Sequence, residues 1–208
     1  MGVFGGGGGP GSIHPIGPAP LNPPSWVTEW DSFSADCQKG LKAAVGGNIE
    51  GMVAAVDRAI AAQSTLKAAA SAESVDWRML AAIGIYETGF VNKKENDGAG
   101  VGVGIFQITN GGDLAANLPW AADVSAGMLR DNFNQITKAL PTLSQQLLTQ
   151  ALADSWNLGP GSVINNIEAG LSPDYHSSPI TRNGVVVGYR GGGDGQYGSD
   201  VVKPISCF

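Results

Sequence analysis

The segment that decides the expected fold is AAIGIYETGFVNKKENDGAGVGVGIFQITNGGD, residues 81–113. It begins with an apolar run that predicts a buried helix ending close to Glu87. Leu80, Ile83 and Glu87 follow one another at spacings of three and four residues, so they lie on one face of that helix. The glutamate therefore continues the apolar stripe rather than the solvent face, which is unusual for a carboxylate.

A glycine-rich segment follows this helix. A polar link that contains Asp97 leads into GAGVGVGIFQIT, residues 98–109, where small residues alternate with branched apolar ones. The alternation predicts a strand or tight hairpin with one bare face, which a ligand or another backbone can approach closely. A dinucleotide-binding glycine loop is disfavoured, because such a loop follows a strand and opens a helix, whereas a helix precedes these glycines.

The chain divides into a leader and one domain. Residues 1–25 are rich in glycine and then proline, and they bury too little apolar surface to offset the entropy of ordering. We interpret them as a flexible leader to a domain that spans residues 26–208. Most of that domain has helical periodicity, while residues 178–190, around Asn183-Gly184, predict a small β-hairpin. The expected class is α+β, mostly α.

The start of the helix that carries Glu87 is predicted from two polar residues. Ser74 is a candidate N-cap, and Asp76 falls in the first turn, where a negative charge suits the helix start.

Composition and charge narrow the possible functions. A net charge of −6 argues against nucleic-acid binding, which needs a basic surface, and gives no electrostatic attraction to anionic membranes or cell walls. No run of about 18 apolar residues occurs, so we expect no membrane span. The first residues also lack the basic and apolar regions of a secretory signal.

The two cysteines, Cys37 and Cys207, lie at opposite ends of the domain. They are either two buried thiols or one disulfide that ties the C-terminus to the first helices. A disulfide would imply an oxidising destination. The only histidines are His14 and His176, so a Cys/His metal site is not expected.

Glu87 is the candidate for acid–base chemistry. A carboxyl group packed against apolar side chains resists ionisation, so its pKa rises towards values at which it can donate a proton near neutral pH. Glycosidic oxygens are poor leaving groups that need such a donor. The alternative is a helix-terminal glutamate that turns out into water.

Several short motifs resemble one family in their order and rough spacing. Goose-type lysozymes and soluble lytic transglycosylases carry an E-S pair at a helix end, a G-L-M-Q strand and an A-Y-N-x-G motif, and the goose type ends in a tyrosine followed by D-V-V. The corresponding segments here are IYETGF (85–90), GVGIFQIT (102–109), SWNLGPGSV (155–163) and YGSDVV (197–202). The resemblance covers about residues 74–203. It implies a lysozyme-like fold with a small β-hairpin beside the catalytic helix.

The resemblance implies a peptidoglycan muramidase without a cofactor. It would hydrolyse the β-1,4 bond between N-acetylmuramic acid and N-acetylglucosamine, with Glu87 as the general acid. The implied substrate-binding residues are Thr88, Gln107, Trp156, Asn157 and Tyr197. A flat aromatic ring can stack on a sugar, and amides can bind its N-acetyl and hydroxyl groups.

The chain also departs from the family pattern. Trp156 stands where the family has tyrosine, so a hydroxyl that could touch the reacting sugar is missing, and Phe106 stands where it has methionine. Two roles stay open: Trp156 could pack in the core, and Asn157 could cap the helix end before Gly159.

Asp97 decides between two outcomes of the expected cleavage. At about 6.5–9.5 Å from Glu87 it would leave room for a water molecule and favour hydrolysis with inversion. If Asp97 is only the turn residue before Gly98, the 6-hydroxyl of the substrate can attack instead. The product would then be a 1,6-anhydromuramic end, as in lytic transglycosylases. We favour hydrolysis.

A non-catalytic sugar-binding module is the second alternative, and it would bind wall-type glycans whether or not Glu87 is present. The GVGIFQI segment (102–108) and the Cys-Phe ending also resemble lysozyme-like domains at the C-terminal ends of bacterial RHS-repeat proteins. That resemblance implies an antibacterial toxin domain, secreted or delivered to the periplasm and cell wall and neutralised by an immunity protein. We expect a monomer whose partners are peptidoglycan glycan strands.

Overall fold

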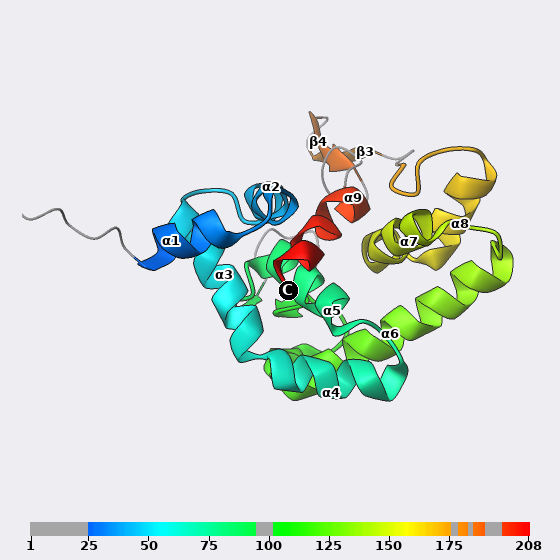
Figure 1. Ribbon diagram of the computed structural model, residues 1–208. Helices are drawn as coiled ribbons and strands as arrows, with labels where there is room; N and C mark the ends of the chain where they lie inside the picture. The colour runs from blue at the N-terminus through cyan, green and yellow to red at the C-terminus, as the bar shows by residue number, and fades with distance from the viewer. Residues whose placement is uncertain (1–24, 95–101, 176–178, 183–184, 190–196) are drawn as a thin grey trace, which may run out of the picture.

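The computed structural model describes residues 25–94, 102–175, 179–182, 185–189 and 197–208. Within these ranges the chain is mostly helical with two small antiparallel sheets, which confirms the α+β, mostly α class. Figure 1 shows the arrangement. In chain order the elements are α1 (Ser25–Ser32), α2 (Ala35–Ala44), α3 (Ile49–Ala61), α4 (Gln63–Glu73), α5 (Trp77–Thr88), β1 (Lys93–Lys94), β2 (Val103–Gly104), the 3-10 helix η1 (Gly112–Ala116), α6 (Leu118–Ala139), α7 (Gln145–Leu158), α8 (Pro160–Glu168), β3 (Pro179–Arg182), β4 (Val185–Tyr189), α9 (Tyr197–Val201) and the 3-10 helix η2 (Lys203–Cys207).

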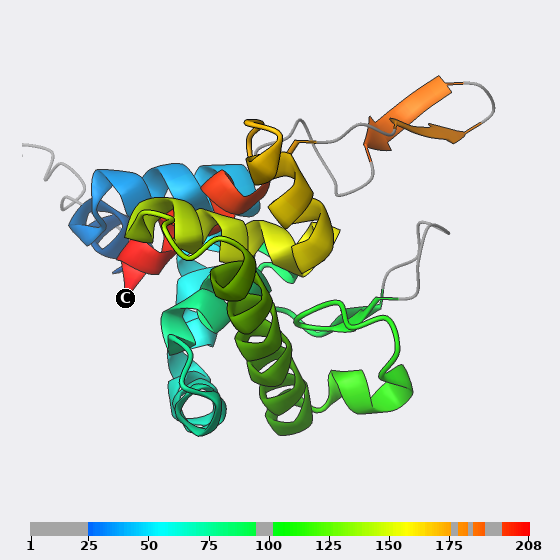
Figure 2. The same ribbon diagram turned by 90° about the vertical axis from the view of Figure 1, so that its right-hand side faces the viewer.

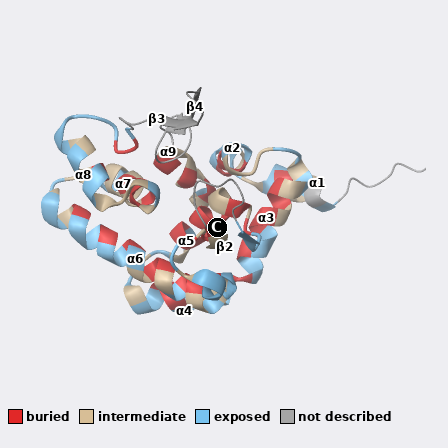
Figure 3. Ribbon diagram, turned by 180° about the vertical axis from the view of Figure 1, so that it is seen from behind, coloured by how far each residue is buried: buried red, intermediate tan, exposed pale blue. Residues whose placement is uncertain are grey.

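Helix α5 is the centre of the fold. All residues from Met79 to Ile85 are buried, so this helix is covered on every side rather than amphipathic. It packs against α2, α3, α4, α6, α9 and η2, and Figure 1 shows it in the middle of the molecule. In Figure 3 the buried residues of the surrounding helices face this centre. The helix that carries Glu87 is therefore held rigidly by packing.

The start of α5 corrects the predicted N-cap. Asp76 is the cap, and its carboxylate accepts a hydrogen bond of 2.9 Å from the backbone N–H of Arg78. Ser74 instead ends α4 in the left-handed conformation, with φ of 56°. The prediction was wrong by two residues because both side chains suit a cap and only the path of the preceding helix distinguishes them.

The end of α5 is fixed by glycine and arginine. Gly89 has φ of 64° and terminates the helix in the left-handed region, where glycine has no steric penalty. The carbonyl of Gly89 accepts a hydrogen bond of 2.7 Å from Nη2 of Arg58, which brings a cation to the C-terminus of the helix. Glu87 is thus presented at a defined helix end.

The predicted hairpin beside this helix is present. β1 and β2 pair antiparallel, Lys93 with Gly104 and Lys94 with Val103. The bare face of the glycine-rich segment is occupied by backbone: at Gly104, where φ is 83°, a Cβ would lie 1.9 Å from the carbonyl oxygen of Ala115. On the α5 side, a Cβ at Gly84 would lie 2.8 Å from Ile105 Cγ2. The glycines therefore allow close packing of η1, the hairpin and α5.

The second predicted hairpin is also confirmed. β3 and β4 pair antiparallel, from Pro179 with Tyr189 to Arg182 with Val185. The predicted turn residues 183–184 lie outside the described residues. Figure 2 shows this hairpin at the edge of the molecule, beyond the helices.

A disulfide closes the fold. Cys37 on α2 and Cys207 in η2 are joined, with 5.0 Å between their Cα atoms, and 170 residues separate them in sequence. Close backbone approach supports the same contact, because a Cβ at Gly40 would lie 2.6 Å from Pro204 Cδ. Of the two cysteine arrangements that the sequence allowed, the structure has the disulfide.

We expect the Cys37→Ser/Cys207→Ser double variant to lose about 3 kcal/mol of unfolding free energy, because the crosslink restricts the unfolded chain over a long loop. Urea unfolding measures the loss. A reducing agent should lower the wild-type midpoint to that of the double variant and leave the variant unchanged. Equal midpoints for all samples would contradict a stabilising disulfide.

Candidate active site

A cleft of about 830 Å³ opens beside the C-terminal end of α5. The β1–β2 hairpin, the segment that follows β2, α6 and the C-terminal end of α7 form its walls. Its lining residues are Glu87, Lys93, Lys94, Gln107, Ile108, Thr109, Asn110, Gly111, Trp120, Val124, Met128, Trp156 and Asn157. The structure thus brings four predicted site residues together, from three separate parts of the chain: Glu87, Gln107, Trp156 and Asn157.

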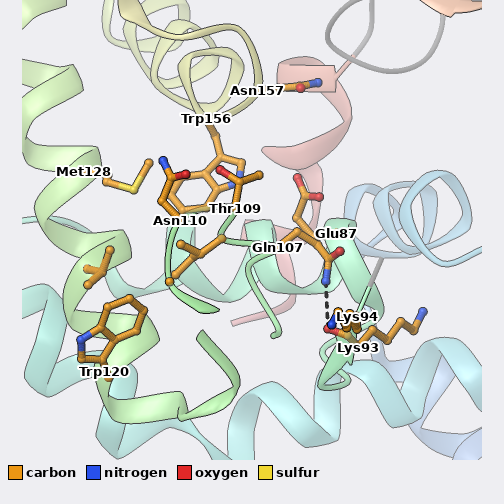
Figure 4. A pocket seen from close by; sticks show the side chains of 13 residues that line it. Glu87, Lys93, Lys94, Gln107, Thr109, Asn110, Trp120, Met128, Trp156 and Asn157 are labelled. Carbon is orange, nitrogen blue, oxygen red and sulfur yellow. Dashed lines mark hydrogen bonds between the residues drawn. The ribbon is translucent and has the colours of Figure 1, made fainter. Parts of the chain in front are cut away.

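Glu87 lies in the last turn of α5 and is half-buried at the cleft. The hydroxyl of Tyr197, from the distant helix α9, donates a hydrogen bond to its Oε1. The Tyr197 ring meets Tyr86 edge-on, with 4.8 Å between the ring centroids, so the phenol is itself held in place. Figure 4 shows Glu87 next to Gln107 in the cleft.

Tyr197 stays protonated near neutral pH. It is 5% exposed, and burial raises its pKa well above the ordinary value, with the nearby Glu87 carboxylate as the next cause. The hydroxyl therefore remains a hydrogen-bond donor to Glu87. This position corrects the predicted role: Tyr197 does not line the cleft as a sugar-binding residue, but is buried and holds Glu87.

Thr88 also differs from its predicted role. It is 3% exposed, and its hydroxyl donates to the carbonyls of Gly84 and Ile105, both at 3.0 Å. The same oxygen accepts a hydrogen bond of 3.2 Å from the N–H of Val91. Thr88 therefore ties the end of α5 to the residue after β2, and it is not among the residues that line the cleft.

Gln107 connects the cleft to the hairpin. Its Nε2 donates to the carbonyl of Gly104 at 2.7 Å and to that of Lys93 at 3.3 Å, the latter drawn in Figure 4. The backbone of Gln107 is left-handed, with φ of 53°, and such strain in a non-glycine residue clusters at functional sites. The side chain is thus pre-positioned in the cleft wall.

Trp156 and Asn157 lie at the C-terminal end of α7. The Trp156 ring lines the cleft and also packs edge-on against the buried Phe106, with 6.4 Å between ring centroids. The ring therefore packs against the core and also faces the cleft. Asn157 lines the cleft near the helix end, which Gly159 terminates with φ of 75°.

Several other residues that line the cleft were not predicted from the sequence. Trp120, at the start of α6, and Met128 line the side of the cleft away from Glu87 in Figure 4. Lys93 and Lys94 lie beneath Glu87, and neither forms an ion pair within the described part of the chain. The cleft thus carries local positive charge on an acidic protein. Residues 111–120, GGDLAANLPW, contain one aromatic residue and no motif that would have indicated this wall.

Asp97, the predicted second catalytic carboxylate, lies outside the described residues. Among the residues that the structure describes, no group of three or more His, Cys, Asp or Glu side chains could hold a metal ion. The described helices also include none with both the length and the apolar character needed to cross a bilayer.

The fold and the cleft define a mostly helical α+β domain with a rigidly held carboxyl group in an open, aromatic-walled groove. No family model, no curated protein and no solved structure matches the chain.

Proposed function

We propose that the protein is a muramidase that cleaves the glycan strands of peptidoglycan, with Glu87 as the general acid. The observation that carries this proposal is the Glu87 carboxyl group at the cleft, oriented from behind by the Tyr197 hydroxyl. An acid that is already fixed by packing and by a hydrogen bond loses little conformational entropy when substrate binds, so it can point at a glycosidic oxygen from the start.

In the proposed reaction Glu87 gives its proton to the leaving glycosidic oxygen as the bond from the anomeric carbon to that oxygen breaks. A water molecule adds to the anomeric carbon and loses a proton to a general base, for which Asp97 is the candidate. Without such a base, the 6-hydroxyl of the muramic residue attacks the same carbon, its proton passes to the now ionised Glu87, and a 1,6-anhydro end forms. The proposal assigns no cofactor to either route.

The remaining cleft residues suit a polysaccharide. Trp156 and Trp120 offer aromatic faces for sugar rings, and the amides of Gln107 and Asn157 can bind N-acetyl and hydroxyl groups. Lys93 and Lys94 supply positive charge for the carboxylates that peptidoglycan carries on its stem peptides. This local charge offsets, within the cleft, the repulsion expected from a net charge of −6.

The test is release of dye-labelled fragments from purified peptidoglycan. Wild type should release dye and Glu87→Gln should not, while Glu168→Gln, an exposed glutamate at the end of α8, should behave as wild type. Saturable wall binding without dye release, equal in wild type and Glu87→Gln, would instead establish a sugar-binding module.

We expect Trp120→Ala to raise KM for a soluble glycan about tenfold, equal to about 1.4 kcal/mol of binding, with little change in kcat. Trp120 lines the cleft away from Glu87, so it can contribute binding without touching the reacting bond. Trp120→Phe keeps an aromatic face and should recover most of the affinity. A fall in kcat with unchanged KM would contradict this role.

The proposed setting is an oxidising compartment at the cell wall, which the Cys37–Cys207 disulfide supports. As a toxin domain delivered to the periplasm, the protein should arrest growth of a bacterium when it carries a periplasmic export signal. Cytoplasmic expression should be harmless, and a dedicated immunity protein would protect the producer. Equal toxicity in both compartments would contradict a wall target.

A further inference from the structure

Asp154 is a buried carboxyl group outside the cleft. It lies on α7, two residues before Trp156, and its side chain has no solvent exposure. Its Oδ1 accepts a hydrogen bond from the backbone N–H of Gly198. Its Oδ2 has no hydrogen-bond partner among the described residues. The side chain of Gln150 acts to lower the pKa of Asp154, but burial outweighs this effect.

The contact with Gly198 is unusually close. A Cβ added at Gly198 would lie 2.3 Å from Cγ of Asp154, so no other residue fits there without displacing the carboxyl group. The first turn of α9 therefore rests directly on Asp154. A carboxyl group at this end of a helix also satisfies one of the N–H groups that the helix itself leaves unpaired.

The N–H that Asp154 holds belongs to the peptide group that joins Tyr197 to Gly198. Tyr197 in turn donates its hydroxyl to Glu87. Asp154, the first turn of α9 and Glu87 thus form a continuous series of contacts that links α7, α9 and α5. These contacts give Asp154 a route to Glu87 through Tyr197, although Asp154 itself does not line the cleft.

Keeping an acid at this position is costly to stability. No ion pair joins Asp154 to a cation within the described residues, and the charged or titratable groups that face it are the Asp174 carboxyl group and the Tyr197 phenol. Asp174 is buried as well, and the Ser172 hydroxyl donates to it. Buried acids without cations destabilise a fold, and such local violations are expected where function requires them.

We propose that Asp154 is a positioning residue for the cleavage reaction: by holding the Tyr197–Gly198 peptide group, it fixes the Tyr197 hydroxyl against Glu87. The proposal rests on the proposed function, and it assigns to Asp154 an effect on turnover without contact to substrate. Asp154→Asn should preserve this effect, because the Asn amide oxygen can accept the same Gly198 hydrogen bond. Asp154→Ala should abolish it, because alanine has no acceptor.

The kinetic test is a double-mutant cycle. Asp154→Ala should lower kcat for a soluble glycan by on the order of tenfold, with little change in KM, because the bound acid is misaligned. Asp154→Asn should restore most of the loss. In the Tyr197→Phe background Asp154→Ala should have almost no further effect, since its route to Glu87 is already cut. Independent, additive losses would overturn the proposal.

Ser125→Ala is the matched control. Ser125 is buried on α6, and its hydroxyl has no hydrogen-bond partner among the described residues, so its removal tests a buried polar truncation without a link to Glu87. It should leave kcat at the wild-type value. If Asp154→Ala does not fold, Asp154→Ser serves instead, because its shorter hydroxyl does not reach the Gly198 N–H.

A second readout does not depend on activity. In protein with isotopically labelled tyrosine, the ring resonance of Tyr197 is identified by its absence from Tyr197→Phe. Asp154→Ala should move this resonance in the same direction as Glu87→Ala, which removes the acceptor of the Tyr197 hydroxyl, and Asp154→Asn should leave it in place. An unmoved resonance in Asp154→Ala would overturn the proposal even if wild type cleaves peptidoglycan. A shifted resonance in a protein that cleaves nothing would uphold the contact and reject only the proposed function.

Discussion

Glu87→Gln is expected to lower kcat for glycan cleavage by about 100- to 10,000-fold, the range that a general acid contributes. Glutamine keeps the shape of the side chain, and its amide oxygen can still accept the Tyr197 hydrogen bond. What it loses is the proton that the leaving oxygen needs. KM should change little, because the substituted atom contributes mainly in the transition state.

Two comparisons separate chemistry from folding in this experiment. Thermal unfolding of Glu87→Gln should match wild type within about a degree or two, since the side chain is only half-buried. The exposed variant Glu168→Gln should retain full activity. A Glu87→Gln protein that is folded and still cleaves at the wild-type rate would remove Glu87 from the proposed chemistry.

The second large effect concerns stability and pH. Burial, followed by the neighbouring Asp174 carboxylate, raises the pKa of Asp154 from 3.8 to about 7 in the folded protein. Between these two values the unfolded chain releases a proton that the folded chain keeps, so rising pH favours unfolding. Below about pH 4 the carboxyl group is protonated in both states and costs no stability. As pH rises from about 4 to about 7, the free energy of unfolding falls progressively. A shift of this size corresponds to about 4 kcal/mol.

Asp154→Asn should remove this dependence, because the amide does not ionise. Urea unfolding of both proteins between about pH 4.5 and 8 measures it: the wild-type curve should fall relative to the variant up to about pH 7 and then run parallel. Asp174 remains in both proteins, and the Tyr197 phenol stays neutral over this range. Parallel curves throughout would contradict a buried acid with a raised pKa.

The central part of the fold follows from local sequence patterns. The apolar run before Glu87 forms the buried helix α5, because a segment that is apolar on all sides has to be covered. The glycine-rich segment after it supplies β2, which pairs with Lys93–Lys94, and β3 and β4 pair as the second predicted hairpin, since alternation and turn residues act over short distances. Local rules failed at Ser74, where two adjacent helices compete for the same polar residues.

The site was only partly predictable for a related reason. Gln107, Trp156 and Asn157 were found through motifs, and all three line the cleft with Glu87. The contacts of Tyr197 and Thr88 were not predicted. A sequence motif does not distinguish a residue that supports a site from one that binds the ligand. Burial separates them, and burial depends on elements that lie far apart in the chain.

Local sequence patterns also could not identify contacts between residues that lie far apart in the chain. Glu87 and Tyr197 are separated by 110 residues, and Cys37 and Cys207 by 170. Gly198 has no signal of its own, yet its lack of a side chain allows Asp154 to approach. Trp120 lines the cleft because α6 packs against η1, which in turn packs against β2. These pairings arise from how the helices meet, which spacing within any one segment does not specify.

The most direct test of the role of Glu87 is mass spectrometry of the soluble fragments that wild type and Glu87→Gln release from purified peptidoglycan. Wild type should release fragments with reducing N-acetylmuramic ends, and Glu87→Gln should release none above background. Anhydromuramic ends that depend on Glu87 would keep the general acid but replace hydrolysis with transglycosylation, and would reduce Asp97 to a turn residue. The absence of fragments from both proteins, or equal fragments from both, would contradict the central claim that Glu87 cleaves the glycan strand.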